Sequence, residues 1–309
     1  MPEYALAIHG GAGTIKRETM SAELEKAYTS TLLAALKAGE AVLADGGAGL
    51  DAIIAAITLM EDSPLFNAGK GAVFTNAGTN ELDASIMDGK TLQAGAVAGV
   101  KRVKNPVLLA RAVMDISRHV MLQGEGADIF AEENGLEMVE PEYFYTERRW
   151  KQLEKLRGKD KTGTLLDPLD EKFGTVGAVA LDMHGNLAAA TSTGGTANKR
   201  WGRVGDSPII GAGTYANNRS CAVSGTGDGE YFIRATVARS ICAKMEFQGL
   251  SLEEAAKSIV MEQLVEMGGR GGVIALDKAG NLVLIFNTLG MYRGSVRAGE
   301  EPLVGIYKD

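Results

Sequence analysis

The sequence contains few of the residues that build metal centres, disulfide frameworks and histidine-based catalytic sites. Its two cysteines, Cys221 and Cys242, lack C-x-x-C spacing, and its three histidines, His9, His119 and His184, are scattered along the chain. We interpret the cysteines as buried free thiols. The histidines form no H-E-x-x-H or similar pattern, which argues against a histidine-rich transition-metal site and against a Ser–His pair. The general base of a hydrolytic reaction would have to be another group.

Long basic runs and long apolar runs are also missing. The 309 residues carry a formal net charge of −7 and contain no long block of Lys and Arg, which argues against nucleic-acid binding. No stretch of about 18 apolar residues could span a bilayer. The first residues, "MPEYALAIHGGAG", lack the basic and apolar regions of a signal peptide. These features predict a cytoplasmic protein with a small-molecule partner and with neither nucleic acid nor membrane as a partner.

Glycine, by contrast, is abundant: 40 residues, about twice the usual fraction, predict frequent tight turns. Apolar periodicity predicts helices at 21–44, 50–62, 105–117 and 146–156, and strands at 4–13, 72–74 and 94–100, the last two separated by "NELDASIMDG". In the second half, residues 177–195 and 271–290 share "ALDxxGNL" and each predict an antiparallel hairpin. A strand at 221–227 and helices near 229–246 and 252–267 lie between them. Strands alternating with paired helices predict a layered α/β or α+β fold.

Residues 157–173, "RGKDKTGTLLDPLDEKF", mix charge, glycine and proline without a helical or strand period. This composition predicts a flexible surface segment. An apolar strand begins directly afterwards at Val176, so the Gly174–Thr175 bond stands between an accessible segment and a rigid one. Such a bond is a favourable place for chain cleavage.

Cleavage at this bond would give Thr175 a free α-amino group beside its own hydroxyl. The amine titrates at about 7.7 to 8.0 when unperturbed, so it can serve as the base for the hydroxyl near neutral pH. The branched Cβ of threonine restricts the direction of that hydroxyl. The local sequence leaves a second interpretation open, in which Thr175 is only the β-favouring first residue of a strand.

Several motifs occur in order along the chain: "IHGGAG", "PLFNAGKGAVF", "ELDASIMDG", "DEKFGTVGAVALD", "ATSTGGTANKRWGRVGDSPIIGAGTYA", "SGTGDGE" and "GGVIALD". From about His9 to Tyr307 the sequence resembles the plant-type asparaginase/isoaspartyl peptidase family of N-terminal-nucleophile hydrolases. The resemblance implies an αββα sandwich in a single domain that cleaves itself into an α subunit, 1–174, and a β subunit, 175–309, with 157–173 as the loose tail of the α subunit. It also implies a dimer of αβ units that hydrolyses L-asparagine and isoaspartyl dipeptides through an acyl-enzyme on Thr175, with no catalytic cofactor.

The resemblance also implies the roles of the residues around Thr175. Thr193 tunes the nucleophile, and Thr226 with the N–H of Gly227 forms the oxyanion hole, where donors meet the charge that develops on the substrate. The remaining positions bind the substrate: Arg203 clamps its α-carboxylate, Asp206 with the carbonyl of Gly229 holds its α-ammonium, and Asn67 lies nearby. From local sequence alone, these stretches are equally typical of an ordinary strand, a glycine-rich turn and a surface ion pair.

Two further features follow from the same resemblance. Gly10 and Gly11 match a glycine motif that shapes the maturation site. A structural sodium ion is implied at backbone carbonyls, an oxygen donor set that suits a hard cation. The carbonyls are those of Met60, Glu61, Ser63, Phe66, Ala68 and Lys70, and the cationic side chain of Lys70 has to point away from the ion.

Two other functions are compatible with parts of this pattern. A glycosylasparaginase also uses an N-terminal threonine, but it typically has Asp before that threonine, where this chain has Gly174. A non-catalytic small-molecule binder of the same fold would keep Arg203 and Asp206 and would need no cleavage. The complete set of threonines favours the hydrolase.

Overall fold

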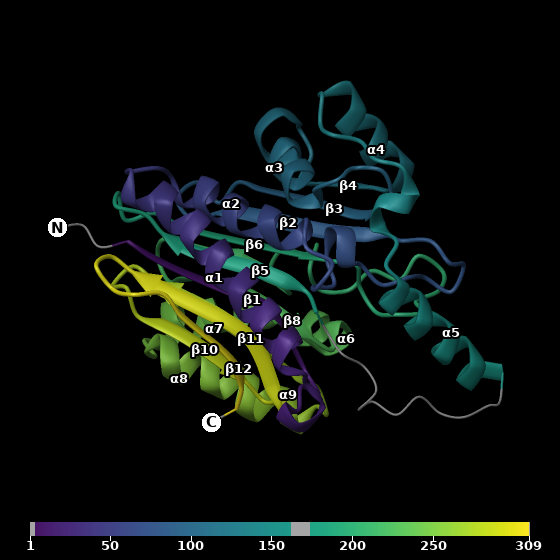
Figure 1. Ribbon diagram of the computed structural model, residues 1–309. Coiled ribbons are helices and arrows are strands. Elements are labelled where there is room, and N and C mark those ends of the chain that lie inside the picture. Colours follow the sequence, from purple (N-terminus) through teal and green to yellow (C-terminus); the bar gives the residue numbers. More distant parts are fainter. Residues whose placement is uncertain (1–3, 162–173, 309) are drawn as a thin grey trace.

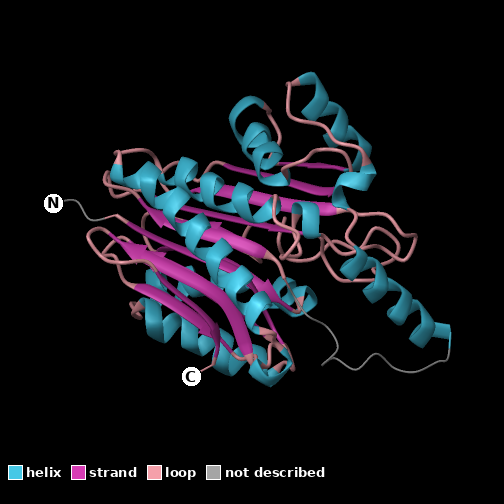
Figure 2. Cartoon of the chain, in the orientation of Figure 1, coloured by secondary structure: helices cyan, strands magenta, loops and turns pink. Residues whose placement is uncertain are grey.

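The computed structural model describes residues 4–161 and 174–308. Four layers stack in the order helices, large sheet, small sheet, helices, as Figures 1 and 2 show. The sequence prediction of an αββα sandwich is therefore confirmed.

The large sheet has eight strands in the order β12-β11-β1-β5-β6-β2-β3-β4 within the described residues. Neighbouring strands run antiparallel, except that β3 and β4 are parallel. The strands are β1 (Ala5–Gly13), β2 (Leu82–Asp88), β3 (Ala94–Val100), β4 (Met121–Gln123), β5 (Val176–Leu181), β6 (Leu187–Thr193), β11 (Gly290–Arg297) and β12 (Leu303–Tyr307). This order places β1 beside β5, so the "HGGAG" segment lies next to the strand that follows Thr175.

The small sheet has four antiparallel strands in the order β10-β9-β8-β7 among the residues described. They are β7 (Thr214–Ala216), β8 (Cys221–Gly227), β9 (Gly271–Asp277) and β10 (Leu282–Phe286). Both predicted hairpins are present, and they lie in different sheets: β5–β6 in the large one and β9–β10 in the small one.

Helices cover the outer face of each sheet (Figure 1). On the large sheet pack α1 (Ala22–Ala44), α2 (Gly49–Glu61), α3 (Pro106–Ile116) and α4 (Gly124–Glu133), whereas α6 (Gly229–Ala235), α7 (Val237–Gln248), α8 (Leu252–Lys257), η5 (Ser258–Gln263) and α9 (Leu264–Glu266) cover the small one. The remaining helical segments are η1 (Arg17–Thr19), η2 (Gly69–Gly71), η3 (Pro141–Phe144) and α5 (Glu147–Lys161). The side chains of Ser21 and Ser251 cap α1 and α8 by accepting from the backbone three residues on. No helix in the described part of the chain is long and apolar enough to cross a bilayer.

Buried apolar side chains fill each of the three spaces between layers. Because successive side chains of a strand point to opposite faces, Leu6 and Ile8 of β1 face the helices, whereas Ala5 and Ala7 face the small sheet. Alanines are also frequent among the other residues between the sheets, on β3, β6, β7 and β8. Small side chains allow the two sheets to approach closely, and Thr193 and Thr226, two of the candidate site residues, are buried in this inter-sheet space.

Some sequence expectations were wrong in detail. Residues 72–74 are not a strand, since Phe74 makes only an isolated bridge to Asn80. The strand in this region is β2, which lies in the stretch expected to be a connection. The sequence did not indicate it because Asp83 and Ser85 interrupt its apolar pattern, although both side chains are buried. The single helix expected near 229–246 is α6 and α7, separated at Thr236 by a left-handed residue with φ of 44°.

Other elements were not predicted at all, namely α4, β4, β7, β11 and β12. Of the segment 157–173, residues 157–161 continue α5 as helix, and 162–173 lie outside the described residues. The helix predicted to begin at Asn105 is present as α3, with Pro106 in its first turn. The Asn105 side chain does not cap it and instead donates to Asp62 Oδ1 at 3.1 Å.

Candidate active site

Thr175 lies directly before β5, on the face of the large sheet that looks toward the small sheet. Its Oγ1 is 2.9 Å from Oγ1 of Thr193, the last residue of the neighbouring strand β6. The pairing of Val176 with Ser192 places these threonines opposite each other at the next step of the ladder. The sheet register therefore brings together two residues that the sequence analysis had selected.

The carbonyl of Gly174, on the other side of the Gly174–Thr175 bond, accepts a hydrogen bond from the backbone N–H of Asn67 at 2.8 Å. Asn67 is itself held firmly: its Nδ2 donates to the carbonyl of Gly195 at 2.7 Å, and its Oδ1 accepts from the N–H of Val73 at 2.9 Å. A rigid donor thus points at the carbonyl oxygen of the bond, and the Thr175 hydroxyl belongs to the residue on the other side of that bond.

Gly10 and Gly11 form an irregularity in β1. The pairing of β1 with β11 shifts register between His9 and Gly11, and Gly11 has a φ of 107°. A Cβ on Gly10 would collide with the ring of Phe66. Glycine at these two positions therefore gives β1 a bulge and a close approach that other residues would prevent.

His9 is fully buried beneath Thr175 and was not selected from the sequence as a site residue. Its Nδ1 lies 3.0 Å from the carbonyl oxygen of Thr175, and its Nε2 lies 2.9 Å from Oγ of Ser224 on β8. Burial lowers the pKa of His9 to about 3, against the opposing effect of the hydrogen bond to Thr175, so the ring is neutral at physiological pH. The sequence argued against a Ser–His catalytic pair; the structure brings the His9 ring beside Ser224, and at Thr175 the ring touches the backbone carbonyl.

Thr226 and Gly227 end β8 on the small sheet. Thr226 is buried, and its Oγ1 accepts from the N–H of Ala12 at 3.3 Å. It lies on the same face of β8 as Ser224, two residues away, and so it faces the large sheet. Gly227 has a φ of 154°, and a Cβ there would collide with the carbonyl of Arg270. The backbone conformation at this position requires glycine.

Arg203, Asp206 and Gly229 converge at one point. A Cβ on Gly229 would lie 2.8 Å from Nη2 of Arg203 and 2.9 Å from Oδ1 of Asp206. The Asp206 carboxyl is buried, and its Oδ2 has no hydrogen-bond partner among the described residues. Burial raises the pKa of Asp206 to about 7, although the charge of Arg203 opposes this shift. A buried carboxyl oxygen without a partner is a place where a cationic ligand group gains a strong interaction.

Glu230 was not selected from the sequence, yet it binds Arg203 directly. Its two carboxylate oxygens each accept at 2.9 Å, one from Nε and one from Nη2 of Arg203. One edge of the guanidinium is therefore occupied, and its Nη1 points toward Gly195 and Gly205. This bidentate pair fixes the plane of the guanidinium and leaves the Nη1 side for a ligand carboxylate.

The chain winds tightly from the end of α2 to Lys70, and two of the predicted carbonyls accept backbone hydrogen bonds, that of Met60 from Ser63 N–H and that of Ala68 from Gly71 N–H. A Cβ on Gly69 would collide with the carbonyl of Glu61, and one on Gly71 with that of Phe66. The Glu61 carboxyl points elsewhere, to Ser192 Oγ at 2.6 Å, and the Lys70 ammonium lies 5.3 Å from the ring centroid of Tyr143. A loop of closely spaced backbone oxygens fits a hard cation. Asn67, which holds the Gly174 carbonyl, belongs to this loop.

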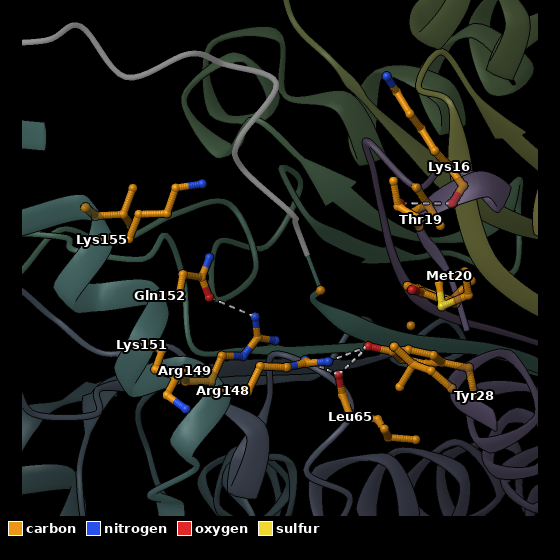
Figure 3. Close-up of a pocket in the computed structure, with 16 residues that line it drawn as sticks. Lys16, Thr19, Met20, Tyr28, Leu65, Arg148, Arg149, Lys151, Gln152 and Lys155 are labelled. Carbon is orange, nitrogen blue, oxygen red and sulfur yellow. Dashed lines mark hydrogen bonds between the residues drawn. The ribbon is translucent and has the colours of Figure 1, made fainter. Parts of the chain in front are cut away.

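A cavity of about 400 Å³ lies on the Gly174 side of the bond, between α5 and the segment from β1 to α1 (Figure 3). Among the described residues, its lining includes five cationic residues and no acidic one, namely Lys16, Arg148, Arg149, Lys151 and Lys155. Arg148 donates to the Tyr28 hydroxyl at 3.0 Å and to the Leu65 carbonyl at 2.8 Å, as Figure 3 shows. The cavity therefore gives the α-chain side of the bond a positive surrounding.

Comparison with known proteins identifies the family of this chain. A family model described as Asparaginase matches residues 2–306. The chain belongs to this asparaginase family. The asparaginase-family chain is 55% identical over 315 residues to the isoaspartyl peptidase of Escherichia coli, a match that covers 100% of the chain and 98% of that relative. It is 53% identical over 316 residues to the isoaspartyl peptidase of Salmonella typhimurium, with 100% of both chains covered.

Eukaryotic relatives of the asparaginase-family chain are similar over nearly the same length. A mouse protein named isoaspartyl peptidase/L-asparaginase is 43% identical over 295 residues, which cover 96% of the chain and 88% of the relative. A protein of Arabidopsis thaliana named probable isoaspartyl peptidase/L-asparaginase 2 is 41% identical over 318 residues, covering 95% and 96%. The resemblance found in the sequence motifs is thereby confirmed.

Proposed function

We propose that the protein is an isoaspartyl peptidase/L-asparaginase, which hydrolyses the side-chain amide of L-asparagine and of β-aspartyl dipeptides. The observation that carries the proposal is the geometry at Gly174–Thr175: the Thr175 hydroxyl pairs with Thr193, and the Gly174 carbonyl accepts from Asn67. The Escherichia coli relative is named isoaspartyl peptidase, and the mouse relative is named isoaspartyl peptidase/L-asparaginase.

The first reaction is cleavage of the chain itself. Thr175 Oγ1 attacks the carbonyl carbon of Gly174, and the negative charge develops on the oxygen to which Asn67 N–H already donates. The C–N bond then breaks, the nitrogen of Thr175 takes up a proton, and Gly174 is left as an ester on Oγ1. Water hydrolyses that ester and leaves a carboxylate on Gly174 and a free amine on Thr175. The products are an α subunit of residues 1–174 and a β subunit of residues 175–309.

The second reaction is turnover of substrate by the new N-terminus. The free amine of Thr175 removes the proton from Oγ1, which attacks the side-chain carbonyl of the substrate. Thr226 and the N–H of Gly227 stabilise the resulting oxyanion, and the amine group leaves with a proton. Water then releases aspartate from the acyl-enzyme. Thr193, at 2.9 Å from Oγ1, orients the nucleophile in both reactions.

The cluster of Arg203, Asp206 and Gly229 binds the aspartyl unit of the substrate. Asp206 and the Gly229 carbonyl bind the substrate ammonium, and Arg203 binds its α-carboxylate from the side that Glu230 does not occupy. The absence of a side chain at Gly229 lets the substrate lie against both charged groups. We further infer a cytoplasmic enzyme that assembles as a dimer of αβ units.

A sodium ion is proposed at the carbonyls of residues 60–70, where it would stabilise the loop that carries Asn67. Replacing NaCl by choline chloride at equal ionic strength is expected to lower Tm, by about 2–4 °C for each kcal/mol of lost binding free energy. Differential scanning calorimetry of the wild type measures this shift. A Tm that is the same in both salts, and a maturation rate that does not change, would remove the sodium proposal.

The choice of substrate is tested by comparing kcat/KM for L-asparagine, β-Asp-Leu and a glycosylated asparagine. We expect the first two to be hydrolysed; all three substrates present the α-amino and α-carboxyl groups on which recognition rests, and they differ only in the leaving amine. The glycosylated substrate should be hydrolysed least. If it is preferred instead, the protein is a glycosylasparaginase, and if none is hydrolysed by cleaved protein, it is a binder of the same fold.

A further inference from the structure

A polar row crosses the inter-sheet space one step below Thr175 and Thr193. Strand register aligns four positions on neighbouring strands of the large sheet: His9 pairs with Gly177, Gly177 with Thr191, and Thr191 with Ser85. On the facing small sheet, Ser224 pairs with Thr214. With the exception of Gly177, each of these positions bears a polar side chain, and each of those side chains is buried. Neither the proposed chemistry nor substrate binding makes use of this row.

The side chains of the row lie within hydrogen-bonding distance from one to the next and alternate between the sheets. The distances are 2.9 Å from His9 Nε2 to Ser224 Oγ, 2.7 Å from there to Thr191 Oγ1, 2.6 Å to Thr214 Oγ1 and 2.8 Å to Ser85 Oγ. At one end His9 Nδ1 lies 3.0 Å from the Thr175 carbonyl. At the other end Ser85 Oγ lies 2.5 Å from the carbonyl of Ser207, which follows Asp206.

The direction of the chain follows from the groups at its ends. A carbonyl oxygen only accepts, so His9 Nδ1 carries the proton and donates to Thr175. The neutral ring then has an unprotonated Nε2, which accepts from the Ser224 hydroxyl. Thr191 can donate to Ser224, and Thr214 to Thr191, in the same sense, and aligned hydrogen bonds polarise and strengthen one another. Ser85 has a single proton, which it donates to the Ser207 carbonyl, so the aligned row ends at Thr214.

Gly177 makes room for this arrangement. A Cβ at that position would collide both with Ser224 Oγ and with His9 Nε2. The gap over Gly177 is where the imidazole from the large sheet meets the serine from the small sheet. A glycine in the middle of a buried strand weakens that strand, so its presence here indicates that the contact above it has a use.

We propose that His9 is a positioning residue for the nucleophile, which holds the Thr175 carbonyl through Nδ1–H and is itself held in that tautomer by the hydroxyls of Ser224, Thr191 and Thr214. This inference rests on the proposed function. Cleavage breaks the bond to Gly174 that orients Thr175 in the precursor. The new terminal residue is then held covalently only through its bond to Val176. The His9 contact then fixes its carbonyl, and with it the direction of the amine and of Oγ1.

Two substitutions of His9 separate the positioning role of its ring nitrogen from the effect of losing the bulk of the ring. Asn places its amide nitrogen near the site of Nδ1, and Gln places its own near the site of Nε2; both lose the ring and remain neutral. In fully cleaved protein we expect His9→Gln to lower kcat by about 10- to 100-fold, the effect of a misplaced reacting group, with little change in KM. His9→Asn should retain most of the wild-type kcat, and Ser224→Ala should lie between the two.

Equal kcat for the Asn and Gln variants overturns the proposal, as does a loss that appears in KM or only in Tm. Failure of the Gln variant to cleave while the Asn variant cleaves normally supports it, since the carbonyl of Thr175 is held in the precursor as well. A wild type that neither cleaves nor hydrolyses β-Asp-Leu refutes the proposed function instead.

An independent test determines the tautomer of the His9 ring without an activity assay. In full-length Thr175→Ala protein, which keeps the carbonyl, ¹⁵N NMR of the histidine rings should show one histidine with a protonated Nδ1 and a bare Nε2 from pH 5 to 8. That signal should be absent from Thr175→Ala protein that also carries His9→Asn. A His9 that is protonated at Nε2, or that titrates within this range, would overturn the proposal.

Discussion

Thr175→Ala is expected to yield one uncleaved chain of 309 residues with at least about 10⁴-fold lower activity on β-Asp-Leu. The substitution removes the hydroxyl that attacks Gly174 and, later, the substrate. Because the uncleaved chain has no amine at residue 175, it lacks the base as well as the nucleophile. Intact-mass spectrometry and a steady-state assay measure the two losses on the same sample.

Thr175→Ser is the matched control for this experiment. It keeps a hydroxyl at the same place and loses only the methyl group that restricts its direction. We expect slower cleavage and a lower kcat, with both products still detectable. Cleavage of the alanine variant between residues 174 and 175, or activity of that variant near the wild-type level, would contradict the assignment of the nucleophile.

Asp206→Asn is expected to lower kcat/KM for L-asparagine by about 10²- to 10³-fold, because truncating one member of a buried charge pair costs several kcal/mol. The amide keeps the shape of the carboxyl and loses the charge that meets the substrate ammonium. The exposed Asp115, which pairs with Arg111 on α3, offers a control, and Asp115→Asn should leave kcat/KM unchanged. If the two variants behave alike, Asp206 does not bind the ammonium.

The dependence of kcat/KM on pH gives a second test of the role of Asp206. Burial raises the pKa of Asp206 to about 7, so in the free enzyme the carboxyl is neutral below that pH and ionised above it. Wild-type kcat/KM should therefore rise with pH through about 7, together with a second rise as the Thr175 amine loses its proton at about 7.7 to 8.0. The Asn variant should keep only the second rise.

Loss of activity in Asp206→Asn should not come from loss of stability. The carboxyl has a pKa of about 3.9 in the unfolded chain and a raised pKa in the folded one, so above both values its ionisation destabilises the folded protein. The neutral amide avoids that cost. At pH 8 the Asn variant should have a Tm at or above that of the wild type, which calorimetry can measure.

Much of the fold could be predicted because its elements have simple periodic patterns. The two "ALDxxGNL" hairpins and α1 to α3 emerge from apolar spacing and turn residues. Strand β2 could not, since Asp83 and Ser85 are polar side chains that only the tertiary structure buries, against Lys199 and Thr214 respectively. The position of β1 between β5 and β11 also joins distant segments, and no local pattern carries that information.

The candidate site likewise contains residues that local sequence could indicate and residues that it could not. Thr175 could be selected by local reasoning, since it stands between a charged segment and a strand, and its partners came from motifs. His9 lies in the quoted "IHGGAG" and Glu230 in "SGTGDGE", but their roles depend on contacts with Ser224, 215 residues away, and with Arg203. A histidine inside an apolar strand was a signal that could have been followed.

The most direct test is intact-mass spectrometry of purified wild-type protein during incubation. Two fragments that meet at Gly174 and Thr175, with hydrolysis of β-Asp-Leu increasing in proportion to the cleaved fraction, are the expected result. An uncleaved chain of 309 residues with full activity would contradict the N-terminal threonine mechanism.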